Sequence, residues 1–199
     1  MRRIVTIITV GVLALSALLS ASLLQAYSAP LCWEAEFARG VTNKVFHVRK
    51  YVEDPSGVVS NNKVLEIPKV AKGEKVKADE VFYHVNVPET GTYYLWARCL
   101  WSTGCGHSFT LKMEGFPTSG WVLGGDATYD SLHWVTISDS GDNSGGKLRP
   151  LHLKKGQMKI MLATRQAGVM VDQFILTTDP KLLPAGVYKP TKGLLVAKD

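Results

Sequence analysis

The sequence of 199 residues predicts an all-β protein, a jelly-roll-like β-sandwich that forms a single domain after an N-terminal signal segment. Several short segments alternate apolar and polar residues with the period of two that is typical of strands. Gly and Pro residues separate these segments, as they do in folds built from many short strands. No segment after the N-terminal one has helical periodicity over a useful length. The pattern taken alone fits either a β-sandwich or a β-barrel.

The N-terminal segment has the form of a secretory signal. Two arginines follow Met1, and residues 4–24 contain no charged side chain. Ala26 and Ser28 are small residues at the two positions that a signal peptidase reads. These features predict a signal peptide over residues 1–28 and a protein exported to the periplasm or the extracellular space. Because the apolar run is near the roughly 20 residues that span a bilayer, an uncleaved anchor is the alternative, and only then is a membrane expected as a partner.

Residues 29–180 contain the predicted strands of the sandwich, each a short run with apolar residues at alternate positions. In chain order, the predicted strands are 33–37, 45–52, 64–67, 81–87, 93–101, 108–113, 132–137, 158–164 and 169–177. Turn residues at 89–91 and at 165–168 predict two β-hairpins. Residues 181–199 contain two further prolines and little pattern, so we expect a C-terminal tail that is extended along the body or loose.

The charge of the exported part is mildly positive. Without the two arginines of the signal, 21 basic and 17 acidic residues remain, a formal net charge of +4. Four lysines cluster between positions 69 and 77, but no aromatic residue lies among them. This pattern indicates a solvated loop, and nucleic acid is not expected as a partner.

Two cysteines lie six residues apart in the stretch CLWSTGCGHSF, which begins at Cys99. In an oxidising compartment we expect Cys99 and Cys105 to form a disulfide that closes the loop between two strands. Free thiols are one alternative. Metal binding or catalysis is the other, but with His107 the stretch supplies three ligands at most. Cys32 is then the odd cysteine, either a buried free thiol or an intermolecular link.

Three motifs resemble a known family of binding domains. The motifs EAE, VPETGTYYLWAR and DQFILTTDP follow one another between Cys32 and Pro180. Their order and spacing resemble carbohydrate-binding modules of families 6 and 35, within the galactose-binding-like β-sandwich superfamily. The resemblance implies a β-sandwich with a binding function. It constrains the function less than the fold, because this fold carries sugar binding, protein binding and architectural roles.

The resemblance also implies a structural calcium ion. The positions that match the family's ligands are Glu34, Glu36 and Asp172, on the first and last predicted strands. Calcium binds six to eight oxygens, and carboxylates on neighbouring strands supply several of them. We therefore expect the first and last strands to be adjacent, with Glu34 or Glu36 close to Asp172. The alternative is that these acids face solvent on an edge strand.

Sugar binding requires an exposed aromatic ring and polar groups for the hydroxyls. The candidate aromatic residues are Trp101, Trp121 and Tyr129, which the sequence places in or beside loops. Asp142 and Asn143 are candidates for the polar contacts. Packing beneath a loop is the alternative role for each aromatic residue.

The sequence therefore predicts a secreted, non-catalytic binding module, with carbohydrate as the first choice of ligand. The alternative is a structural or assembly subunit that uses the same sandwich to bind partner proteins in an envelope or extracellular complex. An enzyme is not expected, because no catalytic triad order, phosphate loop or cofactor fingerprint is present. Glu34 and Glu36 could form a carboxylate pair for glycoside hydrolysis, but the calcium site competes for them.

Overall fold

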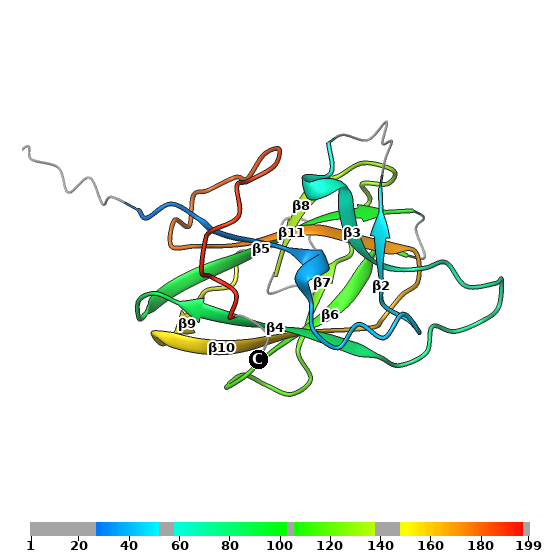
Figure 1. The fold of residues 1–199 in the computed structure, drawn as a ribbon, viewed down its shortest axis with the longest axis horizontal. Helices are drawn as coiled ribbons and strands as arrows, with labels where there is room; N and C mark the ends of the chain where they lie inside the picture. Colours follow the sequence, from blue (N-terminus) through cyan, green and yellow to red (C-terminus); the bar gives the residue numbers. More distant parts are fainter. Residues whose placement is uncertain (1–26, 52–57, 103–105, 138–147, 197–199) are drawn as a thin grey trace, which may run out of the picture.

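The protein is a β-sandwich of two antiparallel sheets, which confirms the predicted fold class (Figure 1). The computed structural model describes residues 27–51, 58–102, 106–137 and 148–196. Among these residues, no helix is long and apolar enough to span a bilayer.

Sheet A is the larger of the two sheets. Its seven strands are β1 (Leu31–Glu34), β2 (His47–Lys50), β3 (Lys63–Ile67), β5 (Gly91–Trp101), β8 (His133–Thr136), β9 (Leu151–Leu153) and β11 (Val169–Thr177). The main order is β2-β3-β11-β5-β8, with β1 paired to β11 and β9 paired to β5. The last strand therefore lies in the centre of the sheet, beside the first.

Sheet B packs against sheet A and has four strands in the order β4-β10-β6-β7. Its strands are β4 (Glu80–Val87), β6 (Ser108–Met113), β7 (Trp121–Gly124) and β10 (Gly156–Ala163). The alternating pattern of β4 buries every second side chain, from Val81 to Val87. Two single 3-10 turns, η1 (Ala35–Phe37) and η2 (Ser60–Asn62), lie next to sheet A.

The core between the sheets is built around three aromatic side chains. The Trp33 and Phe174 rings stack with their centroids 5.2 Å apart, and the Tyr83 ring lies 5.5 Å from that of Phe174. All three side chains are almost completely buried. The Tyr83 hydroxyl donates a hydrogen bond of 2.7 Å to the carbonyl of Ala35, so its polar group is satisfied inside the core.

Both predicted hairpins are wrong. β4 pairs with β10 from Glu80 to Val87, whereas β5, the next strand, belongs to sheet A. The turn after Val87 therefore carries the chain from one sheet to the other, and the turn between β10 and β11 does the same. The turn residues require a sharp reversal of the chain, but they do not determine which strand the following segment pairs with.

Several strand limits also differ from the prediction. The first strand ends at Glu34, where the chain continues as the η1 turn. The predicted strand 45–52 is reduced to β2. β7 and β9 were not predicted, because runs of four and three residues are too short to show alternation.

The C-terminal segment runs extended along the body, which is one of its two predicted arrangements. The backbone N–H of Thr191 donates to the carbonyl of Cys32 in sheet A, at 2.9 Å. Further along, Leu194 is 3% exposed, and Leu195 forms a bridge with Val85 of β4 in sheet B. This strap, residues 180–196, therefore crosses from one sheet to the other.

Candidate functional site

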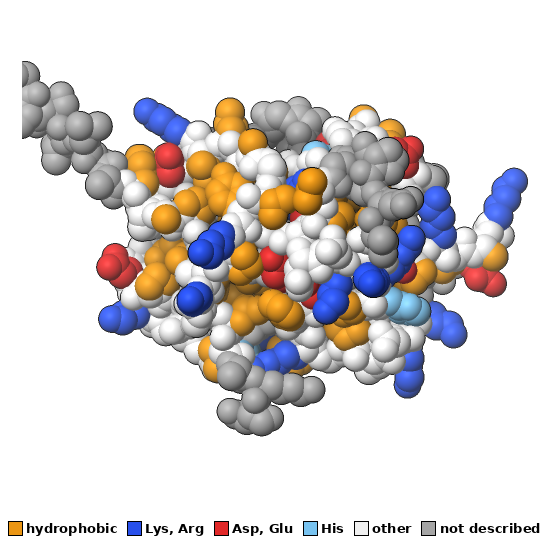
Figure 2. All heavy atoms as spheres, turned by 45° about the horizontal axis from the view of Figure 1, so that its top comes forward, with side chains coloured by type: hydrophobic (Ala, Val, Ile, Leu, Met, Phe, Trp, Pro, Cys, Tyr) orange, Lys and Arg blue, Asp and Glu red, His pale blue; other side chains and the backbone are white. Residues whose placement is uncertain are grey.

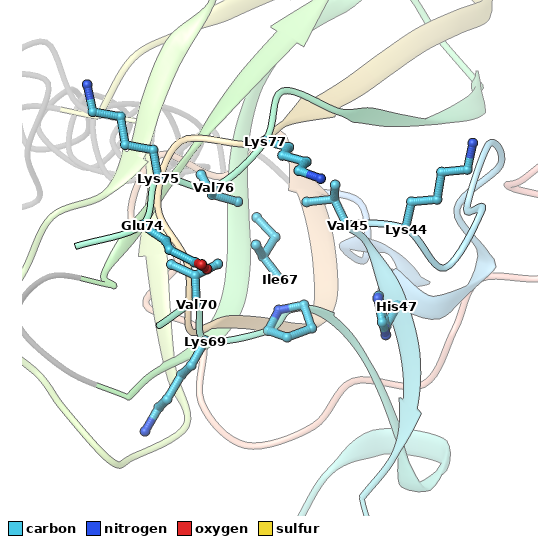
Figure 3. A pocket seen from close by; sticks show the side chains of 11 residues that line it. Lys44, Val45, His47, Ile67, Lys69, Val70, Glu74, Lys75, Val76 and Lys77 are labelled. Carbon is cyan, nitrogen blue, oxygen red and sulfur yellow. The ribbon is translucent and has the colours of Figure 1, made fainter. Parts of the chain in front are cut away.

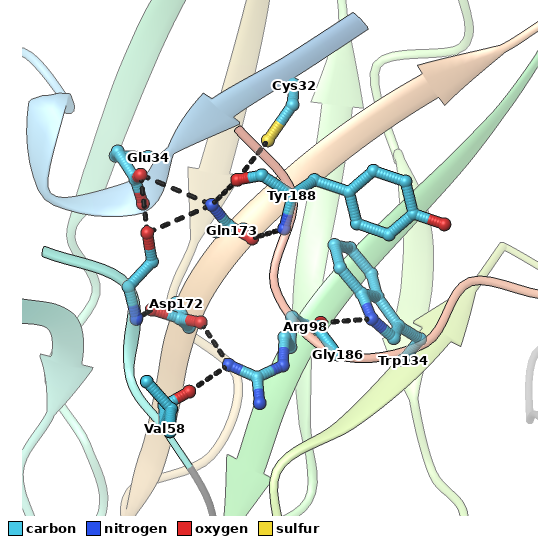
Figure 4. A network of polar contacts seen from close by, with 10 residues as sticks. Cys32, Glu34, Val58, Arg98, Trp134, Asp172, Gln173, Gly186 and Tyr188 are labelled. Atoms are coloured by element: carbon cyan, nitrogen blue, oxygen red, sulfur yellow. Dashed lines mark hydrogen bonds and ion pairs between the residues drawn. The ribbon is translucent and has the colours of Figure 1, made fainter. Parts of the chain in front are cut away.

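A β-bulge in β11 creates a buried polar network. The register between β11 and β5 shifts at Asp172, which has no partner in the ladder. The Asp172 side chain is completely buried and accepts hydrogen bonds from the backbone N–H of Ser60 at 2.9 Å and from Arg98 Nη1 at 2.5 Å (Figure 4). Arg98 is 5% exposed and also donates to the carbonyl of Val58 at 2.8 Å.

The network continues through Gln173 to the first strand and the C-terminal strap. Gln173 Nε2 donates to Glu34 Oε1 at 3.2 Å and to the carbonyl of Tyr188 at 2.7 Å. The Tyr188 N–H donates back to Gln173 Oε1, and the Ser60 hydroxyl donates to Glu34 Oε1 at 2.6 Å. Segments from both ends of the chain thus converge on β11 (Figure 4).

Glu34 and Glu36 are buried acids, so the alternative of solvent-facing side chains on an edge strand is wrong. Glu34 is 3% exposed and Glu36 is 7% exposed. Asn61 Nδ2 donates to Glu36 Oε1 at 2.7 Å, while Oε2 of each glutamate has no hydrogen-bond partner among the described residues. Burial raises the pKa of Glu36 to about 7. Burial also raises the pKa of Asp172 to about 6, because its effect is larger than the opposing effect of the Arg98 charge.

The predicted calcium ligands come together, but they fit a calcium ion only in part. β1 pairs with β11, and Glu34 and Asp172 both bond to Ser60, which confirms the expected adjacency. Oε2 of Glu34 and of Glu36 are unpaired carboxylate oxygens of the kind that calcium prefers. Both oxygens of Asp172 are already bonded, one of them to Arg98. No group of three His, Cys, Asp or Glu that could hold a metal occurs in the described part of the chain.

Cys99 is a free thiol in the structure, and it points into the core with no exposed surface. Burial raises its pKa well above the ordinary value for a thiol. Cys105 lies outside the described residues, so a disulfide between the two stays a prediction. Cys32 is a buried free thiol, 1% exposed, which is the first of its two predicted roles.

Trp101 cannot stack on a ligand, and its assignment as a binding residue is wrong. Its side chain has no exposed surface, and its indole N–H donates to Asp126 Oδ1 at 3.1 Å. Asp126 also accepts a bond from His133 Nε2 at 3.1 Å. Trp101, the final residue of β5, therefore holds the loop that contains Asp126 from within the core, although the sequence predicted that Trp101 would lie beside a loop and be accessible to a ligand.

The other predicted sugar-binding residues remain untested. Trp121 is half-buried, with the Phe116 ring 5.3 Å away and the Arg149 guanidinium 5.7 Å from its ring centre. Tyr129 is 41% exposed. It follows the C-terminal end of β7, whereas Trp121 is the first residue of that strand. Asp142 and Asn143 lie outside the described residues.

The loop between β3 and β4 (residues 68–79) borders two adjoining hollows of about 320 and 730 Å³. We call the pair the lysine groove. Its floor includes Ile67 and Val76, and its two halves share the stretch around Lys69 and Lys75 (Figure 3). Figure 2 shows Lys and Arg side chains gathered at the end of the molecule from which this loop projects. The sequence indicated the lysine cluster, but it did not predict that the cluster would border a hollow.

The chain matches solved structures of other proteins, but it matches no family model and no curated protein by sequence. A family 35 module from Clostridium thermocellum matches with a TM-score of 0.47 at 15% identity, over 75% of this chain and 98% of that one. A family 35 module from Cellvibrio japonicus matches with a TM-score of 0.48 at 12% identity, over 80% and 99%.

A ruminal GH26 endo-β-1,4-mannanase matches with a TM-score of 0.48 at 15% identity, over 76% of this chain. The match spans only 26% of the mannanase chain. These matches span the two carbohydrate-binding modules along nearly their whole length, but only about a quarter of the enzyme.

Proposed function

We propose that the protein is an exported, non-catalytic binding module whose ligand is a carbohydrate. The observation that carries this proposal is the lysine groove, which has an apolar floor and a polar rim. Its two hollows lie within the roughly 300–1,000 Å³ of small-molecule sites. The motifs that resemble families 6 and 35 support it, because they lie on β1 with η1, on β5 and on β11, which are neighbours in sheet A.

The burial of Glu34 and Glu36 supports a non-catalytic role. Glycoside hydrolysis needs two carboxyl groups on opposite sides of the bond that is cleaved. Glu34 and Glu36 are instead held inside the domain by Ser60 and Asn61. This pair is therefore not available to a sugar bound at the surface.

We also propose that Tyr129, rather than Trp101, contributes an aromatic contact to a ligand that extends beyond the lysine groove, because Tyr129 is exposed but does not line the groove. Tyr129→Ala should weaken glycan binding without lowering the melting temperature. Trp121→Ala tests the second remaining candidate. Unchanged glycan affinity in both variants would remove aromatic stacking by these residues from the proposal.

A structural calcium ion remains a proposal, with Glu34 Oε2 and Glu36 Oε2 as the oxygens that would hold it. An ion that binds only the folded state raises the melting temperature. A chelator should then lower the melting temperature and calcium should restore it, and the variant Glu36→Gln should lose this response. An identical melting temperature with chelator and with calcium would exclude the ion.

The function is tested by screening the purified protein on an array of neutral and acidic glycans. Saturable binding to at least one glycan, confirmed by calorimetry, is the expected result. Failure to bind any glycan would overturn the proposal.

A role in assembling other proteins is the second candidate, and exposed apolar side chains favour it. Leu183 on the C-terminal strap is 81% exposed, and Val58 is 74% exposed. Figure 2 shows several hydrophobic side chains gathered on the face it presents. Such surface suits a protein partner. A pull-down from the native envelope tests this role, and a partner lost on Leu183→Asp substitution would support it.

A further inference from the structure

We infer that the lysine groove binds the chain of a carboxylated polysaccharide. This inference rests on the proposed carbohydrate-binding function and names the class of sugar. It follows from the charge of the groove, its shape and the side chains that it lacks.

The charge around the groove is strongly biased toward cations. Five lysines and Arg165 border it, against a single carboxylate, that of Glu74. The lysines are Lys44, Lys69, Lys72, Lys75 and Lys77. None of the five forms an ion pair with a described residue, whereas Lys112, on β6 outside the groove, pairs with Glu80 at 3.2 Å. The ammonium groups of the groove are therefore available to an external anion.

The shape of the groove suits a chain of several anionic units. The side chains of Lys44, Lys69 and Lys75 extend away from the centre in different directions, while Ile67 lies between them (Figure 3). The two hollows adjoin along residues 69–76, so positive charge is distributed over their combined length. Cations at separate points along a groove match an anion that repeats along a polymer. The apolar floor can contact the carbon-bound hydrogens of the sugar rings.

Nucleic acid and lipid surfaces fit the groove less well. Proteins that bind single-stranded nucleic acid stack the bases on aromatic side chains. The described residues that line the groove include no Phe, Tyr or Trp. A bilayer surface is broad and flat, whereas the cations here border hollows. A flexible carboxylated polymer has no bases that need aromatic side chains, and it can enter a hollow.

The inference is tested by titrating the purified protein with polygalacturonate and with its fully methyl-esterified form, which keeps the sugar ring but removes the charge. Binding to polygalacturonate should weaken markedly between about 0.1 and 1 M NaCl, as the Debye length falls from about 10 to 3 Å. The methyl ester should bind at least about tenfold more weakly. The double variant Lys69→Glu/Lys75→Glu should lose binding by about tenfold or more.

A matched control separates the groove from the overall charge of the protein. Lys154→Glu/Lys155→Glu makes the same charge change at two exposed lysines outside the groove and should keep wild-type affinity. All four substituted lysines are exposed, so circular-dichroism melts should show intact folds. Equal losses in the two double variants would overturn the inference.

The remaining outcomes distinguish this inference from the proposed function. Binding to neutral glycans without binding to polygalacturonate would overturn the inference and leave the proposed function standing. No binding to any glycan would overturn both. Binding of anionic vesicles or of an oligonucleotide in preference to polygalacturonate would assign the groove to another class of ligand.

Discussion

Removing the Arg98 guanidinium should strongly destabilise the domain. The variant Arg98→Met keeps most of the aliphatic stem but leaves the buried Asp172 carboxylate with only the Ser60 N–H. The Arg98 side chain is 6% exposed and that of Asp172 is 0% exposed, so water does not replace the lost partner. Breaking a buried ion pair by removing one partner costs about 3–5 kcal/mol.

The solution pH decides where in this range the cost lies. Burial raises the pKa of Asp172 to about 6 even with Arg98 present. Without Arg98 the carboxyl group can take up a proton near neutral pH, which lowers the cost. Urea denaturation of Arg98→Met should therefore show a larger loss at alkaline than at mildly acidic pH. At about 2–4 °C per kcal/mol, thermal melts should fall by about 10 °C.

A double-mutant cycle tests whether the loss comes from the pair. The variants are Arg98→Met, Asp172→Asn and the two combined, each compared by urea denaturation. The double variant should lose less stability than the sum of the single variants, with a coupling of about 1–3 kcal/mol. The pair of Arg49 and Glu66 is the control, because the Arg49 side chain is 50% exposed, and Arg49→Met should cost less than about 1 kcal/mol. Additive losses for Arg98 and Asp172 would refute the assigned role of the pair.

Three further predictions concern the strap, the buried glutamate and the cysteines. Leu194→Ala should lower the free energy of unfolding by about 2–5 kcal/mol, because the side chain is buried, while Leu183→Ala on the exposed part of the same strap should cost under about 0.5 kcal/mol. Without calcium, the raised pKa of Glu36, about 7, means that the folded state holds this proton more tightly than the unfolded state does. The free energy of unfolding should then fall by about 3 kcal/mol as the pH rises from about 4.5 to about 7, and Glu36→Gln should remove this slope. Mass spectrometry of the protein recovered without reductant from an oxidising compartment should show Cys99 bonded to Cys105, and two free thiols there would contradict the disulfide.

Alternation of apolar residues predicted most strands but not their pairing. The alternation in the sequence of β4 is correct in the structure, whereas β5 buries every side chain from Leu95 to Trp101. The sequence identifies both segments as strands. It does not show that one strand belongs to sheet B and the other to sheet A, because both arrangements bury the same side chains. Pairing depends on contacts between distant segments, such as β1 with β11, which only the family resemblance suggested.

The same limit applies to the candidate site. Glu34, Glu36 and Asp172 were predicted to lie together because the resemblance placed them on the first and last strands. Arg98 and Ser60, which bond to Asp172, were missed because they come from other segments and match no ligand pattern. The lysine groove was missed because a charged loop has the same sequence pattern whether it lies over a hollow or projects into water.

The central position of β11 has a consequence for how the chain folds. β11 pairs with β1, β3 and β5, and Leu31 near the start of the domain pairs with Leu176 near its end. Sheet A therefore cannot be completed until almost the whole domain has been synthesised, although pairs such as β2 with β3 involve earlier segments alone. Folds dominated by such distant pairings form in milliseconds to seconds, more slowly than helical bundles. The folding of such a chain is completed only after its final strand has joined the others.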